Sequence, residues 1–283
     1  MKLCHDAAAL LGEGALWDDR KKVLYWIDII NKQLHKYDPA TEEKTAYEIG
    51  QYIGTVALTE DDRLLLALED GIALFDEATQ RLEWLNDLEK DHPANRCNDG
   101  KCSPDGYFWV GTLAVSLAPD AGSFYRVAPD GSYQKFGGAY TIPNGLGWSP
   151  DGRTMYHIES NPGYVTAYDY EAGNITNERV IIRVPDHMGG PDGMAIDEAG
   201  MLWIAHYGGS SVRRWNPATG EVLQQIDLPV SQITTCTFGG EDLRDLYITT
   251  ARQGLADGQE PLAGGLFCVR TDVKGLPSYR WRV

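Results

Sequence analysis

Residues 98–106 read NDGKCSPDG, and residues 144–152 read NGLGWSPDG. In both stretches an Asn leads a short segment that ends in Ser-Pro-Asp-Gly, where Pro presets φ and Gly supplies a positive φ. Such a turn joins two strands, and a β-type run follows each one, at residues 107–110 and 154–158. The pair therefore predicts one strand–turn–strand unit, repeated at a spacing of 46 residues.

The same unit occurs six times along the chain, at intervals of 41, 44, 46, 48 and 42 residues. Its leading residues are Glu13, Gly54, Asn98, Asn144, Asp192 and Thr234. A period of this length, built from short strands, is typical of a β-propeller. We therefore predict an all-β, six-bladed β-propeller with four-stranded antiparallel blades around a central channel, forming a single domain over residues 1–283. Residues 2–10 are expected to supply the outer strand of the last blade, and residues 114–121 to form a loop over the channel mouth.

Composition limits the classes of partner. The formal net charge is −16, which argues against nucleic acids and anionic membranes because both require a basic face. The five cysteines are odd in number and lack metal-binding spacing. No segment resembles a signal peptide, and apolar runs such as residues 64–68 are far too short to cross a membrane. We expect a reduced, cytoplasmic protein, monomeric or weakly homo-oligomeric, that acts on a small molecule.

Equivalent positions in a propeller converge on the central axis, so the leading residues of distant repeats should meet. Four of them carry carboxylate or amide oxygens, namely Glu13, Asn98, Asn144 and Asp192. Asn-Gly and Asp-Gly are common turn dipeptides, but the Ser-Pro-Asp-Gly segments already supply the hairpin turns here. At the start of an inner strand an unpaired carboxylate carries a large desolvation penalty, which a bound cation relieves. An all-oxygen set formed by Glu13, Asn144 and Asp192 favours a hard ion, Ca²⁺ first, with Mg²⁺, Mn²⁺ and Zn²⁺ as alternatives.

Other catalytic chemistry has no candidate in the sequence. There is no Gly-x-Ser-x-Gly motif, no Ser/His/Asp order and no phosphate-binding loop. His157 and His206 fall in or just after second strands, where we expect them to be packed strand histidines.

Six motifs resemble one known family over nearly the whole chain. They are LGEG at 11–14, NRCNDGK at 95–101, PNGLGWS at 143–149, PDGM at 191–194, TTCTFGG at 234–240 and YITTAR at 247–252. In this order they are similar to the SMP-30/gluconolactonase/LRE family (regucalcin-like). The resemblance implies a six-bladed propeller with one divalent metal ion that hydrolyses aldonolactones. It also implies metal ligation by Glu13, Asn144 and Asp192, substrate contacts from Arg96 and Asn98, and a general base in Asp192.

The chain departs from the family pattern on the substrate side. Ser116 stands where a family member carries a substrate-contacting Glu, and Glu159 stands where the family usually has Asp. We count Ser116 as a substrate contact that accepts weaker hydrogen bonds than a carboxylate. The expectation is a looser demand on distal sugar hydroxyls, so that pentonolactones are accepted as well as hexonolactones. If the loop does not contact the sugar, selectivity would lie elsewhere, near Tyr140 or Tyr207.

The expected reaction is lactone ring opening, with the metal polarising the carbonyl and Asp192 deprotonating a water. A second hypothesis is hydrolysis of another lactone or a phosphotriester at the same site. A third is a non-enzymatic calcium-binding propeller. Arg96 and Asn98 favour an enzyme, because a metal store has no need of donors suited to sugar hydroxyls.

Overall fold

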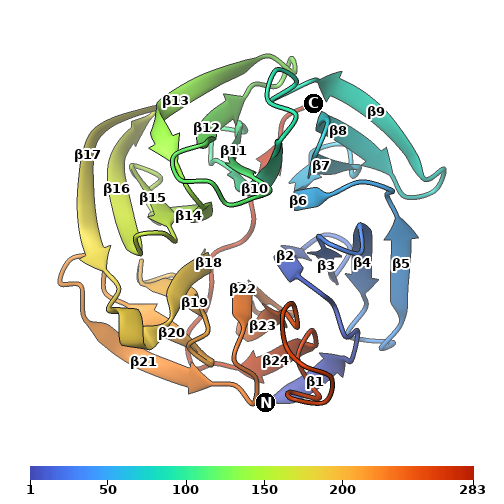
Figure 1. The fold of residues 1–283 in the computed structure, drawn as a ribbon, viewed down its shortest axis with the longest axis vertical. Coiled ribbons are helices and arrows are strands. Elements are labelled where there is room, and N and C mark those ends of the chain that lie inside the picture. The colour runs from blue at the N-terminus through green and yellow to red at the C-terminus, as the bar shows by residue number, and fades with distance from the viewer.

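The computed structural model of the chain describes residues 1–283, with Gly138 described only as part of its strand, and arranges the strands in a ring (Figure 1). Within the described chain the strands form six blades, which confirms the predicted fold class. Blade 1 contains β2 (Gly12–Asp18), β3 (Val23–Asp28), β4 (Gln33–Tyr37) and β5 (Lys44–Glu48), and blade 2 contains β6 (Ile53–Thr59), β7 (Leu64–Leu68), β8 (Gly71–Asp76) and β9 (Arg81–Asn86). Blade 3 contains β10 (Asn95–Cys102), β11 (Phe108–Ala114), β12 (Gly122–Val127) and β13 (Tyr133–Tyr140), and blade 4 contains β14 (Pro143–Trp148), β15 (Thr154–Glu159), β16 (Tyr164–Glu171) and β17 (Asn174–Arg183). Blade 5 contains β18 (Gly190–Ile196), β19 (Leu202–Tyr207), β20 (Ser211–Trp215) and β21 (Val222–Asp227), and blade 6 contains β22 (Ile233–Gly239), β23 (Asp245–Thr250) and β24 (Leu266–Arg270).

The N-terminus completes blade 6. Strand β1 (Lys2–His5) pairs antiparallel with β24, and Leu3 lies opposite Phe267. The sheet order is therefore β1-β24-β23-β22, as the sequence predicted for residues 2–10. This pairing joins the first segment of the chain to the last blade and covers the edge of β24.

The apolar core is divided among the junctions between blades. Six buried clusters occur in the described chain, one between each pair of neighbouring blades. The cluster between blades 6 and 1, for example, packs Trp17 and Trp26 against Tyr247 and Leu266. Because strand faces alternate, each sheet contributes one set of side chains to each neighbour.

Each inner strand carries an irregularity at its channel-facing start. The pairing register shifts between Glu13 and Leu16, between Asn144 and Leu146, and equivalently in the other four inner strands. A bulge inserts an extra residue, bends the strand and re-aims a side chain. The leading residues of the repeats therefore sit at bulges, and those with carboxylate or amide groups turn their side chains toward the axis.

Glycine at these bulges lets neighbouring inner strands approach closely. A Cβ atom on Gly145 would lie 2.6 Å from the carbonyl oxygen of Asp192. A Cβ atom on Gly193 would lie 2.0 Å from Thr235 Oγ1. The Asn-Gly and Asp-Gly pairs are thus needed for bulge packing at the axis and are not hairpin turns.

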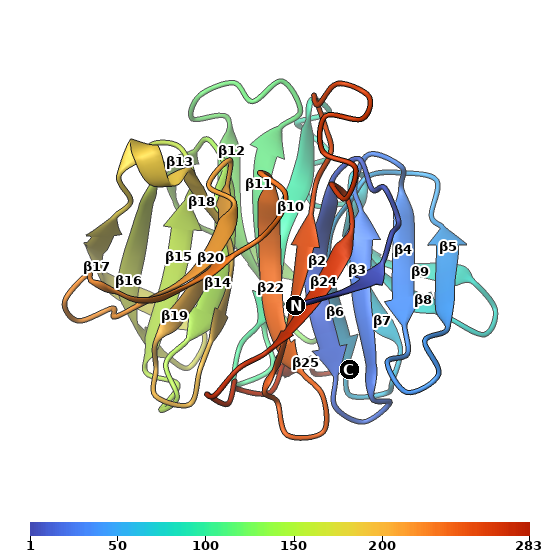
Figure 2. The same ribbon diagram turned by 90° about the horizontal axis from the view of Figure 1, so that it is seen from below.

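A C-terminal strap, residues 271–283, crosses beneath the ring at the end opposite the 114–121 loop (Figure 2). The N–H of Leu276 donates to Ile196 in blade 5 at 3.0 Å, and the N–H of Glu60 in blade 2 donates to Trp281 at 3.0 Å. Strand β25 (Arg280–Trp281) pairs in parallel with β6, and Arg280 forms an ion pair with Asp18 of blade 1 at 2.6 Å. Sequence analysis did not predict this strap, which links blades far apart in the chain.

Helical structure is represented by the 3-10 turn η1 (Asp186–Met188). No helix within the described residues has the length and apolar character needed to span a bilayer.

Replacing Trp281 with Ala should destabilise the protein strongly. Its side chain is only 1% exposed and packs in the cluster between blades 2 and 3. We expect the free energy of unfolding to fall by about 3–5 kcal/mol, as for other buried Trp truncations. The matched control is Trp84→Ala, because Trp84 is 46% exposed on β9 and should lose about 0.5 kcal/mol. Equal losses in urea denaturation would show that the strap does not stabilise the ring.

Candidate metal and substrate site

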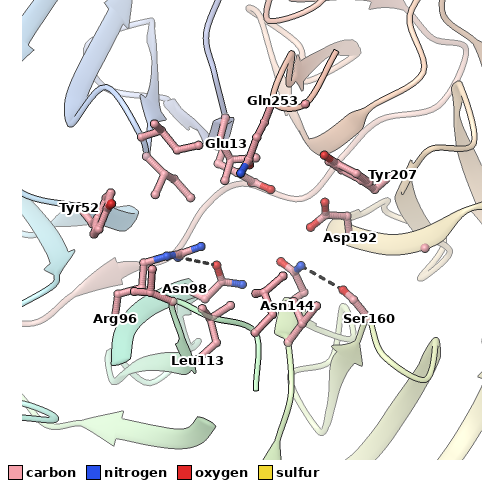
Figure 3. A pocket seen from close by; sticks show the side chains of 18 of the residues that line it. Glu13, Tyr52, Arg96, Asn98, Leu113, Asn144, Ser160, Asp192, Tyr207 and Gln253 are labelled. Atoms are coloured by element: carbon pink, nitrogen blue, oxygen red, sulfur yellow. Dashed lines mark hydrogen bonds between the residues drawn. The ribbon is translucent and has the colours of Figure 1, made fainter. Parts of the chain in front are cut away.

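A cavity of about 820 Å³ lies at the end of the channel where the inner strands begin. Its polar lining comes from Glu13, Tyr52, Arg96, Asn98, Asn144, Ser160, Asp192, Tyr207 and Gln253. Figure 3 shows these side chains converging from several blades on one space. All four leading residues that carry carboxylate or amide groups line it, whereas Thr234 donates to the carbonyl oxygen of Gly12 and lies outside the lining.

Two buried carboxylates share this space. Glu13 comes from β2 in blade 1 and Asp192 from β18 in blade 5. Burial raises the pKa of Glu13 to about 8, with a further contribution from Asp99, although the Gly14 N–H donates to Glu13 Oε2 at 3.0 Å. Burial and the nearby negative charge of Glu13 also raise the pKa of Asp192 well above its ordinary value. The channel therefore disfavours two negative charges together unless a cation is present.

A divalent cation fits the residues that are present. Asp192 Oδ1 is buried and has no hydrogen-bond partner within the described chain, and such an orphaned oxygen requires a compensating partner. The described residues contain no group of three or more His, Cys, Asp or Glu side chains placed to hold a metal. The candidate set instead has two carboxylates, Glu13 and Asp192, with the amide oxygen of Asn144 as the third donor.

Ser160 fixes the orientation of Asn144. Asn144 Nδ2 donates to Ser160 Oγ at 3.1 Å, and Ser160 Oγ donates to the carbonyl oxygen of Pro191 at 2.6 Å. Because the amide nitrogen is held on Ser160, Oδ1 of Asn144 is left to accept or ligate. The same hydroxyl ties β14 to the residue that precedes Asp192. Sequence analysis missed Ser160 because it follows a second strand and has no place in the repeat pattern.

Arg96 and Asn98 form one hydrogen-bonded unit on the other side of the cavity. Arg96 Nη1 donates to Asn98 Oδ1 at 2.9 Å and to the carbonyl oxygen of Cys97 at 2.8 Å. Asn98 Nδ2 donates to the carbonyl oxygen of Pro143 at 2.9 Å. Arg96 Nε and Nη2 have no partner among the residues described, so they remain as donors for a bound molecule. Burial lowers the pKa of Arg96, while Glu13 acts in the opposite direction.

Ser116 lies away from the cavity lining. It is exposed on the loop between β11 and β12, while its neighbours Val115 and Leu117 line the cavity. Glu159 also lies outside the lining, and its carboxylate accepts hydrogen bonds from the N–H groups of Thr141 and Ile142. It thereby holds the segment that leads into β14.

Three further polar side chains reach the cavity. Tyr52 and Gln253 come from loops, and Tyr207 ends β19 (Figure 3). Of the two alternative selectivity residues that the sequence suggests, Tyr207 lines the cavity and Tyr140 lies outside the lining. Tyr52 and Gln253 carried no sequence signal, because loop residues do not follow the repeat.

The two strand histidines are packed residues. His157 and His206 are buried, and burial lowers the pKa of each to about 3. Neither lines the cavity. Both expectations from the sequence are confirmed.

Comparison with known proteins places these features in a family context. Residues 11–252 match the family described as SMP-30/Gluconolactonase/LRE-like region. YvrE of Bacillus subtilis, named as a candidate sugar lactone lactonase, is 34% identical over 275 residues, covering 95% of this chain and 94% of that protein. Regucalcin of Xenopus laevis is 34% identical over 277 residues, covering 94% of this chain and 93% of that protein. The crystal structure of a calcium-binding protein, regucalcin from Agrobacterium tumefaciens, aligns with a TM-score of 0.95 at 32% identity, covering 99% of this chain and 97% of that chain.

Ser160→Ala should weaken cation binding. Without the hydroxyl, the amide of Asn144 is free to rotate, and loss of such an orienting partner typically costs about 10–100-fold in metal affinity. Ser160→Thr keeps the hydroxyl and is the matched control. Calorimetric titration of the chelator-treated protein with Ca²⁺ measures both affinities. Wild-type affinity in Ser160→Ala would show that Ser160 does not position the amide.

The metal-free protein should lose stability as the pH rises. Between the ordinary pKa of 4.5 and the raised value of about 8, the native state keeps a proton on Glu13 that the unfolded chain has lost. The native state then binds more protons than the unfolded state, so the free energy of unfolding falls with increasing pH. In chelator, the Tm of the wild type should therefore fall more steeply over this window than that of Glu13→Gln. Parallel curves for the two proteins would contradict the raised pKa.

Proposed function

The chain belongs to the SMP-30/gluconolactonase/LRE-like family, and on that premise we propose that it is a divalent-cation-dependent hydrolase that opens the ring of sugar aldonolactones. One observation carries the proposal. The paired carboxylates Glu13 and Asp192 share a cavity with the donor pair Arg96 and Asn98. The relative named for sugar lactone lactonase activity supports the same substrate class.

Glu13, Asn144 and Asp192 would hold the cation. Their oxygens suit Ca²⁺ best, and a similar solved protein is described as calcium-binding. Mg²⁺, Mn²⁺ and Zn²⁺ are the alternatives for a set of this kind. When bound, the ion would polarise the lactone carbonyl and offset negative charge that develops on its oxygen.

The side chains of the protein would transfer the proton and bind the substrate. Asp192 accepts a proton from the water that attacks the carbonyl carbon. As the bond between that carbon and the ring oxygen breaks, Asp192 returns the proton to the ring oxygen, which becomes a hydroxyl group. Arg96 donates to substrate oxygens through Nε and Nη2, and Asn98 keeps the guanidinium in place at 2.9 Å. Ser116, exposed on its loop, would act only on substrate parts that extend beyond the mouth.

A non-enzymatic calcium-binding propeller is the second candidate, since several relatives are named regucalcin. The position of Arg96 argues against a purely calcium-binding role. A binding site for an ion alone gains nothing from a buried guanidinium whose free donors face the same cavity. Hydrolysis of phosphotriesters or other lactones would use the same groups, and assays on a panel of substrates distinguish it from aldonolactone hydrolysis.

Asp192→Ala and Arg96→Ala should lower hydrolysis to different extents. Hydrolysis of a panel of aldonolactones and phosphotriesters is measured by the acid that it releases. Asp192→Ala should lose cation-dependent stabilisation and at least about 10²–10⁴-fold of the turnover, because it removes a ligand and the base. Arg96→Ala should keep the stabilisation and lose about one to two decades of kcat/KM, as expected for one charged hydrogen bond.

Wild-type protein treated with chelator is the reference for both variants. Full activity in that state would contradict cation dependence. Cation-dependent stabilisation without hydrolysis of any panel member would favour the calcium-binding alternative.

A further inference from the structure

Part of the cavity wall is apolar and offers a sugar lactone no hydrogen-bonding group. One wall comes from blade 3, where Leu113 at the end of β11 is followed by Val115 and Leu117 on the loop. In Figure 3 Leu113 lies beside Arg96 and Asn98, so this wall begins directly next to the donor pair.

A second apolar wall comes from blade 1. Ile29 and Ile30 follow β3 and line the cavity together with Leu11. The N–H of Ile29 donates to the carbonyl oxygen of Leu11 at 3.0 Å, which holds the two segments together. The backbone on this side is thus already hydrogen-bonded, and the wall offers aliphatic side chains.

Two residues of the first wall are unusually exposed for their type. Val115 is 48% exposed and Leu117 is 51% exposed. Exposed apolar side chains that adjoin a cavity commonly mark a binding surface. Their burial by a ligand would stabilise a complex in proportion to the apolar area covered.

The lining leaves four polar side chains for a substrate, Tyr52, Arg96, Tyr207 and Gln253, and the apolar walls add none. Glu13, Asn144 and Asp192 are assigned to the cation, and Ser160 is engaged with Pro191. A sugar hydroxyl pressed against Leu113 or Ile29 would lose its hydration without gaining a partner, which is unfavourable.

The size of the cavity points in the same direction. A volume of about 820 Å³ is in the upper part of the range of about 300–1,000 Å³ that holds drug-sized ligands. A bare aldonolactone is smaller than such ligands, so space beside the walls remains for a substituent.

We propose that the preferred substrate is a lactone whose ring carries an alkyl substituent, and that the walls formed by Leu113, Val115, Leu117, Leu11, Ile29 and Ile30 bind that substituent. This inference rests on the proposed opening of lactone rings and refines its substrate class: aldonolactones are hydrolysed, and lactones with an alkyl substituent are preferred. The polar floor binds the lactone group, and the apolar mouth selects what is attached to it.

The test is a series of δ-lactones with alkyl chains of increasing length, assayed with the Ca²⁺-loaded protein beside δ-gluconolactone. We expect kcat/KM to rise by up to about fourfold for each added methylene until the walls are covered. Leu117→Ser should lower the ratio of long-chain to short-chain kcat/KM by about tenfold, because it removes one apolar contact surface. Leu223→Ser is the matched control, since Leu223 is 47% exposed on β21, outside the cavity, and the ratio should not change.

Two outcomes would overturn the inference and are distinguishable. Hydrolysis of δ-gluconolactone with no gain from alkyl chains would leave the lactonase function standing and refute the apolar selectivity. Hydrolysis of no lactone at all would refute the proposed function, and the inference with it.

Discussion

Each blade packs both of its faces against neighbours, and blades 1 and 6 gain their common junction only because the ring closes. Trp17 and Trp26 of blade 1 meet Tyr247 of blade 6 in that junction. Strand β1 then ties the start of the chain to β24. A sheet face left without its neighbour would expose a whole apolar cluster to water, so the six junctions stabilise one another. The position of every side chain in the cavity depends on this closure.

Closure of the ring also explains how polar side chains from distant blades meet in one cavity. Glu13 and Asp192 belong to blades 1 and 5, yet bulges at the starts of β2 and β18 turn both toward the axis. Gly145 and Gly193 bring the inner strands close enough for the groups to share one space. Because the two carboxylates are close and buried, their ionised forms are unfavourable without a cation, as their raised pKa values indicate.

The repeat period was sufficient to predict the six blades, the role of β1 and the convergence of Glu13, Asn98, Asn144 and Asp192. These features follow from a spacing that the backbone imposes on every unit. Ser160, Tyr52 and Gln253 were missed because they lie after strands or on loops, where side-chain direction does not follow the repeat. The direction of Ser116 could not be predicted either, since only folding decides which of three successive loop side chains line the cavity. The strap was missed because its contacts are with residues far apart in the sequence.

The strap affects how molecules enter and leave the cavity. Ser278 and Tyr279 adjoin the inner strands at the far end of the channel, beside two small spaces of about 50 and 20 Å³. A molecule that reaches the floor near Glu13 must therefore leave by the mouth through which it came. Arrival and departure compete for one passage, so the dwell time of an outgoing molecule limits how soon the next can arrive. In the proposed reaction the net charge of −16 would affect that exchange, because it repels an anionic product more than a neutral substrate.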